Sequence, residues 1–241
     1  MKHKKRMPIP LFPTASLKIK PAAINLAGIK SLIGRKQQNA TELVRKRYDR
    51  LAALYDAMEW PLEKMRFGGW RSRLSSCIGG SRALEIGVGT GKNMRYYPPA
   101  ASITAIDVSD KMLARARRHA IKKELSVELL QMDAQRLAFP DDSFDIVFAT
   151  FVFCSVPDPV QGLKELHRVC KPGGGLFLLE HMRPGTTVVG VVFDLLNPIA
   201  VRLSGANINR RTVKNIEKAG WQIIRIENLS SDIVRWIEAT P

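Results

Sequence analysis

Residues 83–93 read Ala-Leu-Glu-Ile-Gly-Val-Gly-Thr-Gly-Lys-Asn, and this stretch decides the fold of the chain. An apolar run followed by a turn with glycine at every second position is typical of a buried strand whose end approaches a ligand. Asp107 ends a second apolar run, 103–106, where the next parallel strand is expected to end. Together the two runs predict a nucleoside site. A glycine-rich turn alone is also compatible with a tight strand-to-helix connection that needs positive φ.

The spacing of the glycines distinguishes between kinds of nucleotide site. A dinucleotide site has the pattern Gly-x-Gly-x-x-Gly, whereas this turn has Gly87, Gly89 and Gly91. Glu85 precedes the glycines and would repel a pyrophosphate, but it suits a ligand that carries an ammonium group. No Gly-Lys-Ser or Gly-Lys-Thr follows at the spacing of a phosphate-binding P-loop. The turn therefore predicts a ligand with a nucleoside and a positive charge.

Strand and helix patterns alternate after Gly79-Gly80. Strands are expected at 82–86, 103–107, 126–131, 144–150 and 175–181, and helices at 91–97, 110–124 and 159–170. A helix at 211–220 and strands at 221–226 and 233–239 follow. Alternation of this kind predicts an α/β, Rossmann-like fold with a mostly parallel seven-stranded sheet and helices on both faces. A helix capped by Thr41 and ending near Met58, with another at 62–74, forms an added N-terminal segment.

The N-terminal residues differ in charge from the rest of the chain. The formal net charge is +16, and residues 1–41 contain nine Lys or Arg and no acid. We therefore divide the chain into a basic leader, 1–40, and one domain, 41–241. Apolar residues at helical spacing within 21–34 predict a basic amphipathic segment. It is compatible with a membrane-surface anchor, a helix packed on the domain, or an organelle transit peptide in a eukaryotic host.

Cysteine spacing and hydropathy exclude several protein classes. Cys77, Cys154 and Cys170 have no paired spacing and no clustered histidines, so we expect neither a disulfide framework nor a zinc or other metal site. The longest apolar segment, 186–203, contains Asp194 and Asn197-Pro198 near its middle, which argues against a spanning helix. We expect a cytoplasmic protein held peripherally at the inner face of a membrane, or organelle targeting in a eukaryote.

These residues resemble those of the class I methyltransferases that use S-adenosylmethionine, over roughly residues 42–241. In that family the glycine turn contacts the amino-acid part of the cofactor. The residues carried over for this role are Glu85, Gly87, Gly89 and Gly91. Asp107 matches the acid that accepts hydrogen bonds from both ribose hydroxyls, as a carboxylate can. Val108 and Met112 are assigned to the same cofactor-binding set.

Two later segments extend the resemblance. In the first, Gln131-Met-Asp-Ala134, the side chain of Asp133 and the backbone N–H of Ala134 are implied to read the adenine edge. In the second, Thr150-Phe-Val-Phe153, Thr150 and Phe151 are implied to form the floor under the sulfonium. Aromatic residues at alternate positions are equally typical of a core. Lys-Pro-Gly-Gly at 171–174 also recurs in this family.

The flanking segments resemble a narrower group. Residues 47–56, Arg-Tyr-Asp-Arg-Leu-Ala-Ala-Leu-Tyr-Asp, are similar to a motif shared by menaquinone and ubiquinone C-methyltransferases and bacterial phosphatidylethanolamine N-methyltransferases. Residues 151–159 and Leu-Glu-His181 resemble the phospholipid enzymes and the membrane-associated thiol methyltransferases of animals. The resemblance implies that Tyr55 and Tyr48 line the sulfonium or amine, and His181 can remove an amine proton. The alternatives to these catalytic roles are structural: the tyrosines pack the helix on the sheet, and the histidine only ends a strand.

Three kinds of methyl acceptor are compatible with the sequence. A phospholipid headgroup of the phosphatidylethanolamine type fits the basic leader, with Arg202, Arg210 and Arg211 available for its phosphate. A quinone ring or a small thiol is the alternative. A basic cluster on the helix at 110–124 is compatible with RNA, but no Asn-Pro-Pro-Tyr-type sequence or aromatic RNA-binding signature accompanies it. We therefore expect a lipid or other small-molecule acceptor at an anionic membrane surface, and no nucleic acid.

Overall fold

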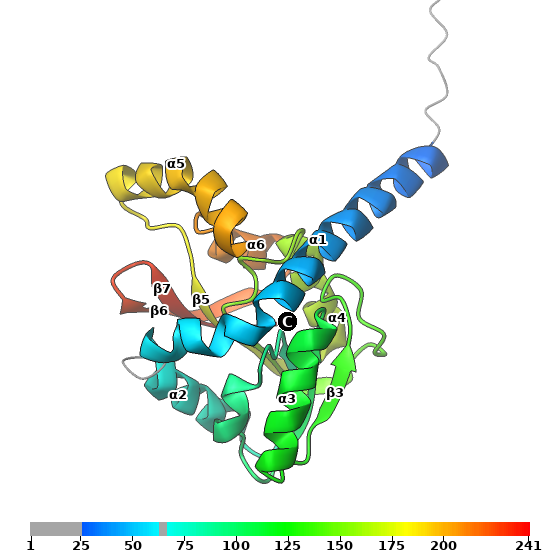
Figure 1. Cartoon of the computed structure of the whole chain (residues 1–241). Helices are drawn as coiled ribbons and strands as arrows, with labels where there is room; N and C mark the ends of the chain where they lie inside the picture. Colours follow the sequence, from blue (N-terminus) through cyan, green and yellow to red (C-terminus); the bar gives the residue numbers. More distant parts are fainter. Residues whose placement is uncertain (1–25, 63–66) are drawn as a thin grey trace, which may run out of the picture.

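The structure, a computed structural model, describes residues 26–62 and 67–241 (Figure 1). Most of the basic leader lies outside this part, as does the beginning of the helix expected at 62–74. The helix that follows, α2, begins at Gly68 and ends at Ile78.

A seven-stranded sheet in the order β3-β2-β1-β4-β5-β7-β6 forms the centre of the described residues. The strands are β1 Arg82–Ile86, β2 Ser102–Asp107, β3 Glu128–Gln131, β4 Phe144–Thr150, β5 Cys170–His181, β6 Gln222–Ser230 and β7 Val234–Thr240. The first five strands pair in parallel, whereas β7 is antiparallel to both β5 and β6. The predicted mostly parallel seven-stranded sheet is therefore confirmed.

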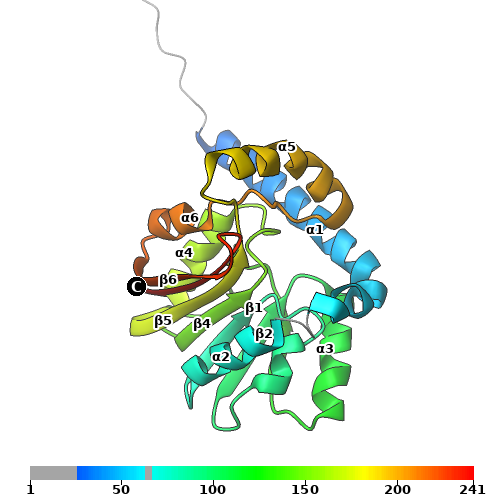
Figure 2. The same ribbon diagram turned by 90° about the vertical axis from the view of Figure 1, so that its left-hand side faces the viewer.

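Helices cover both faces of this sheet (Figure 2). Besides α2, they are α3 Asp110–Lys122, α4 Pro159–Val169 and α6 Thr212–Lys218. Because side chains alternate along a strand, Leu84 of β1 packs in the cluster that includes α4 and α6, whereas its neighbour Ala83 packs with α2 on the other face. Ser109 caps α3 by accepting a hydrogen bond from the Met112 N–H, and Asp158 caps α4 in the same way.

The helix expected at 91–97 is instead a short 3-10 helix, η2, Lys92–Tyr96. It follows Gly91, whose φ of 90° places the chain in the left-handed region. The turn is closed by a bond from the Tyr97 N–H to the Met94 carbonyl. The chain thus leaves the glycine turn too tightly to start an α-helix there.

Helix α1, Leu26–Leu62, is a single helix of 37 residues. It runs through Thr41, so the helix cap predicted there is wrong. The amphipathic pattern before Thr41 and the helical pattern after it join in one helix without a break. Its N-terminal part projects beyond the sheet, and its C-terminal part crosses the edge where the parallel strands end (Figures 1 and 2).

Helix α5, Thr187–Ser204, connects β5 to α6 and contains Pro198. It lies at the same end of the molecule as the projecting part of α1 (Figure 2). The polar residues that interrupt the apolar segment in the sequence do not break the helix. Within the described ranges, neither α5 nor any other helix combines the length and the hydropathy needed to cross a bilayer.

Candidate functional site

A cavity with about 720 Å³ of empty space, part of it open to solvent, lies where β1, β2 and β4 end, beneath α1. Most of the predicted site residues line it. They are Tyr48, Tyr55, Gly87, Gly89, Asp107, Val108, Met112, Asp133, Ala134, Thr150 and Phe151. Glu85, Gly91 and His181 are close by but do not line the cavity. A concave site at the carboxyl ends of the strands of an α/β sheet is typical of small-molecule and cofactor binding.

The glycine turn forms one wall of the cavity. Gly87 and Gly89 have φ angles of 66° and 56°, which other residues rarely adopt. A Cβ on Gly87 would lie 2.5 Å from Cγ2 of Val152, so only glycine allows β1 and the segment after β4 to approach this closely. A Cβ on Gly89 would meet no atom within 4 Å, since it would point into open space beside the cavity. The turn thus leaves room for a ligand to approach the backbone.

Glu85 lies beneath the turn rather than in the cavity. It is 1% exposed, and its carboxylate accepts hydrogen bonds from Asn93 Nδ2 (2.7 Å) and from the Tyr97 hydroxyl. Burial raises its pKa to about 7, although these two bonds act in the opposite direction. Buried Arg71 of α2 donates to Asn93 Oδ1 (2.7 Å) and to Thr150 Oγ1 (2.8 Å). This network, which joins β1, η2, α2 and β4, was not predicted beyond Glu85 and Thr150.

Asp107 ends β2 with its carboxylate in the cavity. Its Oδ2 accepts from the Gly89 N–H (2.9 Å) and its Oδ1 from the Ser109 N–H (2.8 Å). Burial raises its pKa to about 6, against the lowering effect of these backbone N–H groups. Each carboxylate oxygen can accept more than one hydrogen bond, so both remain able to accept from a ligand. A half-buried carboxylate next to an open glycine turn fits a ribose.

Asp133, beyond the end of β3, is held by residues that the sequence did not single out for this role. Thr41 of α1 donates from Oγ1 to Asp133 Oδ2 (2.8 Å), and the Gln135 N–H donates to Oδ1 (2.9 Å). The Gln135 amide nitrogen also bonds Thr41 Oγ1 (2.9 Å). Asp133, the acid expected to read adenine, is therefore hydrogen-bonded to α1.

Tyr48 and Tyr55 lie on the face of α1 that is turned to the cavity. They lie seven positions apart in the sequence, which is about two helical turns. Their rings meet edge-on with centroids 6.3 Å apart, and the Tyr48 hydroxyl is hydrogen-bonded to Ser155 Oγ at 2.7 Å. The Lys92 ammonium lies 5.4 Å from the centroid of the Tyr55 ring, so this ring already interacts with a cation. Both tyrosines line the cavity, and their contact with a sulfonium or an amine stays a prediction.

An aspartate follows each tyrosine and fastens α1 to the domain. Asp49 Oδ1 accepts from Ser109 Oγ (2.6 Å) at the start of α3. Asp56 Oδ1 accepts from Thr90 Oγ1 (2.6 Å) in the glycine turn, and its Oδ2 pairs with Arg115 of α3 (2.8 Å). The repeated Tyr-Asp pairs thus direct one side chain into the cavity and the next to its rim.

Phe151 lies at the floor of the cavity in a left-handed conformation, with φ of 58°. Buried Glu180 holds this turn, since its Oε1 accepts from the N–H groups of Val152 (2.8 Å) and Phe153 (3.0 Å). Burial raises the pKa of Glu180 to about 7. A non-glycine residue at positive φ is uncommon and is often found at functional sites.

His181 stacks on the ring of Phe151, with centroids 6.0 Å apart, and does not itself line the cavity. Burial lowers its pKa, so it is neutral at pH 7. Its role as a base remains a prediction. Arg210, expected to be available for a phosphate, instead donates to the Val156 carbonyl (2.7 Å), whereas Arg202 and Arg211 are exposed. A guanidinium has further N–H donors, so the expectation that Arg210 meets a phosphate stays a prediction.

Comparison with known proteins agrees with this geometry. The family described as a methyltransferase domain matches residues 84–178. Over 104 residues the chain is 44% identical to a phosphatidylethanolamine N-methyltransferase of Cereibacter sphaeroides, covering 42% of this chain and about half, 51%, of that protein. It is 35% identical over 169 residues to a demethylmenaquinone methyltransferase of Deinococcus radiodurans, covering 68% of this chain and 70% of that one.

A further relative and a solved structure extend the comparison. A thiol S-methyltransferase TMT1B of Rattus norvegicus is 34% identical over 151 residues, covering 60% of this chain and 61% of that protein. A methyltransferase of Thermotoga maritima that depends on S-adenosylmethionine shares the fold, with a TM-score of 0.62 and 21% identity over 81% of this chain and 98% of that one. The chain therefore belongs to the class I methyltransferases, and S-adenosylmethionine is its methyl donor.

Proposed function

We propose that the cavity beneath α1 holds S-adenosylmethionine and that the acceptor is the amine of a phosphatidylethanolamine-type headgroup, including its partly methylated forms. In this proposal Asp107 accepts hydrogen bonds from the ribose, and the turn containing Gly87 and Gly89 approaches the amino-acid part. Asp133 and the Ala134 N–H read the adenine. All of these residues line the same cavity, which supports the assignment.

The bound donor supplies a methyl group on a sulfonium, and the chain's residues orient the acceptor and exclude water. Tyr48 and Tyr55 offer aromatic faces, which attract cations and exclude water from the centre. Phe151 closes the side of the cavity opposite the two tyrosines. An amine must lose a proton before it can attack, and neutral His181, adjacent to Phe151, is the proposed base.

The tyrosine pair on the cavity wall is the observation that carries the choice of an amine. The headgroup before it loses its proton, the methylated product and the sulfonium are all cationic, and aromatic faces suit all three. The similarity to a phosphatidylethanolamine N-methyltransferase supports the same choice. We place the protein peripherally on an anionic membrane surface, at the cytoplasmic face or within an organelle of a eukaryotic host. The basic leader supports this placement because it has no acid.

A quinone ring is the second candidate acceptor. It is favoured by the similarity to a demethylmenaquinone methyltransferase. That match covers more of this chain than the match to the phosphatidylethanolamine N-methyltransferase. Binding of RNA is less well supported, because Arg115 and Arg117 of α3 are paired with Asp56 and Asp110. These pairs reduce the free positive charge of the basic cluster.

The decisive experiment offers the full-length chain labelled S-adenosylmethionine and a panel of acceptors: phosphatidylethanolamine vesicles, a demethylated quinone, small thiols and RNA. We expect the label in the lipid fraction, with products that carry one or more methyl groups. An Asp107→Ala variant serves as the inactive control. Label found only in the quinone or thiol fraction would overturn the lipid proposal.

A further inference from the structure

The outward side of α5 is apolar, which is unusual for a surface helix. We define the apolar face of α5 as Val188, Val192, Leu195, Leu196, Ile199 and Leu203. Leu195 is 72% exposed and Leu203 is 78% exposed. Exposed apolar side chains are normal when they are scattered, but a continuous set along one helix marks an interaction surface.

The side of α5 that faces the domain is small and polar. Gly190 is buried there, and Asp194 pairs with Arg183 at 2.9 Å and accepts from Asn209 Nδ2 at 3.0 Å. Asn197 Oδ1 accepts from the Ile208 N–H at 2.9 Å. The helix is therefore inverted relative to an ordinary surface helix, whose apolar side faces the core. Its polar residues hold it to the protein and its apolar residues point away.

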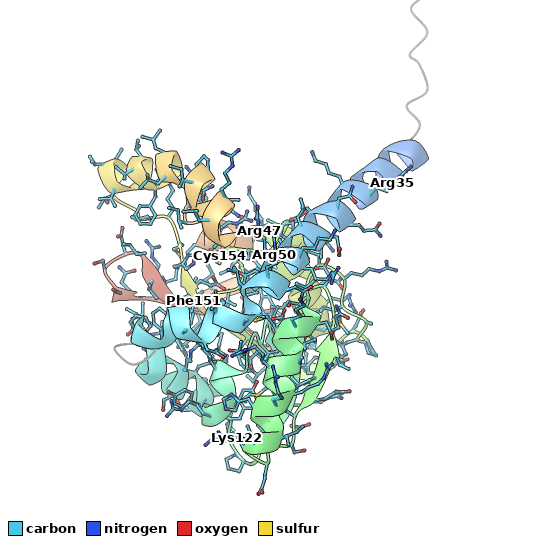
Figure 3. The ribbon with its side chains drawn as sticks, in the orientation of Figure 1. Arg35, Arg47, Arg50, Lys122, Phe151 and Cys154 are labelled. Carbon is cyan, nitrogen blue, oxygen red and sulfur yellow. The ribbon has the colours of Figure 1, made fainter. Side chains whose placement is uncertain are left out.

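The surroundings of this face are basic. Arg202 is exposed near the end of α5, and Arg35 and Lys36 are exposed on the projecting part of α1 at the same end of the molecule (Figures 1 and 3). The one acid of α5, Asp194, is paired with Arg183. An apolar helix face flanked by bases complements a bilayer with anionic headgroups.

We propose that the apolar face of α5 inserts into the interfacial region of an anionic lipid bilayer. The helix lies in the surface rather than across it, because it does not have the length and hydropathy of a spanning helix. The inference rests on the proposed lipid acceptor, and it names the surface from which that acceptor is taken.

Hydrogen bonds connect this helix to the cavity. The loop after α5 contains Asn207, whose N–H and Nδ2 both donate to the Cys154 carbonyl at 2.9 Å. Cys154 is followed by Ser155, which is hydrogen-bonded to Tyr48. Docking through α5 therefore brings the wall of the cavity to the membrane surface. A lipid headgroup can then enter without its acyl chains leaving the bilayer.

The test uses the full-length chain and vesicles of phosphatidylethanolamine and phosphatidylglycerol at about 3:1. In Leu195→Glu we expect the partition coefficient to fall by about tenfold or more, since burying one leucine side chain contributes at least that factor. The matched control is Ile121→Glu. Ile121 is 76% exposed on α3, next to Lys122 at the opposite end of the molecule (Figure 3), and we expect its replacement to leave partitioning unchanged.

A second measurement does not depend on a charged substitution. In Leu195→Trp, lipids with brominated acyl chains should quench the added fluorescence, whereas in Ile121→Trp they should not. Wild-type partitioning of Leu195→Glu, or equal quenching of the two tryptophan variants, would overturn the proposal. A wild-type dimer that Leu195→Glu dissociates, with vesicle binding unchanged, would assign the face to a second copy instead.

Methyl transfer separates this inference from the proposed function. We expect Leu195→Glu to lose methylation of vesicle lipid while it retains methylation of a short-chain phosphatidylethanolamine that is dissolved as monomers. If the wild type methylates neither lipid, the proposed acceptor is wrong, and flotation and quenching still decide whether α5 docks on a bilayer.

Discussion

Asp107 links cofactor binding to pH. Because burial raises its pKa to about 6, the carboxylate is mostly ionised at pH 7.5 and mostly protonated at pH 5.5. Protonation removes acceptor capacity for the ribose, so we expect the affinity for S-adenosylhomocysteine to fall as the pH drops, centred near 6. The raised pKa also means that this group favours the folded state as the pH falls from 6 towards 4, so unfolding through this group does not explain the loss.

Calorimetric titration at several pH values measures this dependence. Asp107→Ala should weaken binding by about 100-fold or more at pH 7.5, because two hydrogen bonds to a charged group are lost. Asp110→Ala, an exposed aspartate three residues further on, should bind like the wild type. Unchanged affinity in Asp107→Ala would refute its place in the site.

Glu180 is expected to hold the floor of the cavity. Replacing it by Ala leaves the buried N–H groups of Val152 and Phe153 without an acceptor, and we expect a loss of about 2 kcal/mol or more in the free energy of unfolding. Glu180→Gln keeps an oxygen at this position and should recover most of that loss. Urea unfolding measures both, with exposed Glu217→Ala as the control. Equal destabilisation by Ala and Gln would contradict this account.

Sequence reasoning identified residues that line the cavity where the residue follows a strand. Asp107 and Gly87 were found because the apolar runs before them mark strand ends. Arg71 and Asn93 were missed as partners of Glu85, because a buried network between α2, η2 and β1 has no local spacing that reveals it. Glu85 was read as facing the ligand, whereas its partners hold it beneath the turn.

At the level of elements, the fastening of α1 determines how firmly the cavity is covered. Asp49→Ala and Asp56→Ala remove its bonds to Ser109 and to Thr90 and Arg115. We expect each variant to raise the KM for S-adenosylmethionine about three- to tenfold, since partly exposed bonds of this kind contribute about 0.5–1.5 kcal/mol, with kcat little changed.

Hydrogen exchange provides the readout that a general loss of stability would not produce. Exchange should increase in residues 41–58 and remain unchanged in the strands. Glu42→Ala, which removes a surface ion pair with Arg45 on the same helix, is the matched control. If its KM rises as much as that of Asp56→Ala, the fastening role is wrong.

The strands and the helices that cover them followed from periodicity, but the limits of α1 and the orientation of α5 did not. Thr41 resembles a helix cap in the sequence, and its bonds to Asp133 and Gln135, far along the chain, explain its position within a helix. Asp194 and Asn197 looked like interruptions of an apolar segment. They are inward contacts of a continuous helix, whose partners Arg183 and Ile208 lie outside the segment.

For the molecule as a whole, the uneven charge predicts how the chain approaches a membrane. Deletion of residues 1–36 removes nine bases, each of which contributes about 1 kcal/mol of attraction near an anionic surface. We expect vesicle flotation to fall much more than methyl transfer to a short-chain lipid. High salt should reduce the difference between the two chains. Equal flotation of full-length and shortened chains would exclude the leader as an anchor.

The position of Thr41 and the two Tyr-Asp pairs has a consequence for repeated turnover. An amine that receives several methyl groups needs a fresh donor molecule each time, and α1 covers the side of the cavity where the donor is proposed to lie. Under the proposed function we expect its bonds to Asp133, Ser109 and Thr90 to open once per methyl group. Whether the half-finished lipid stays bound during that opening decides between processive and distributive methylation.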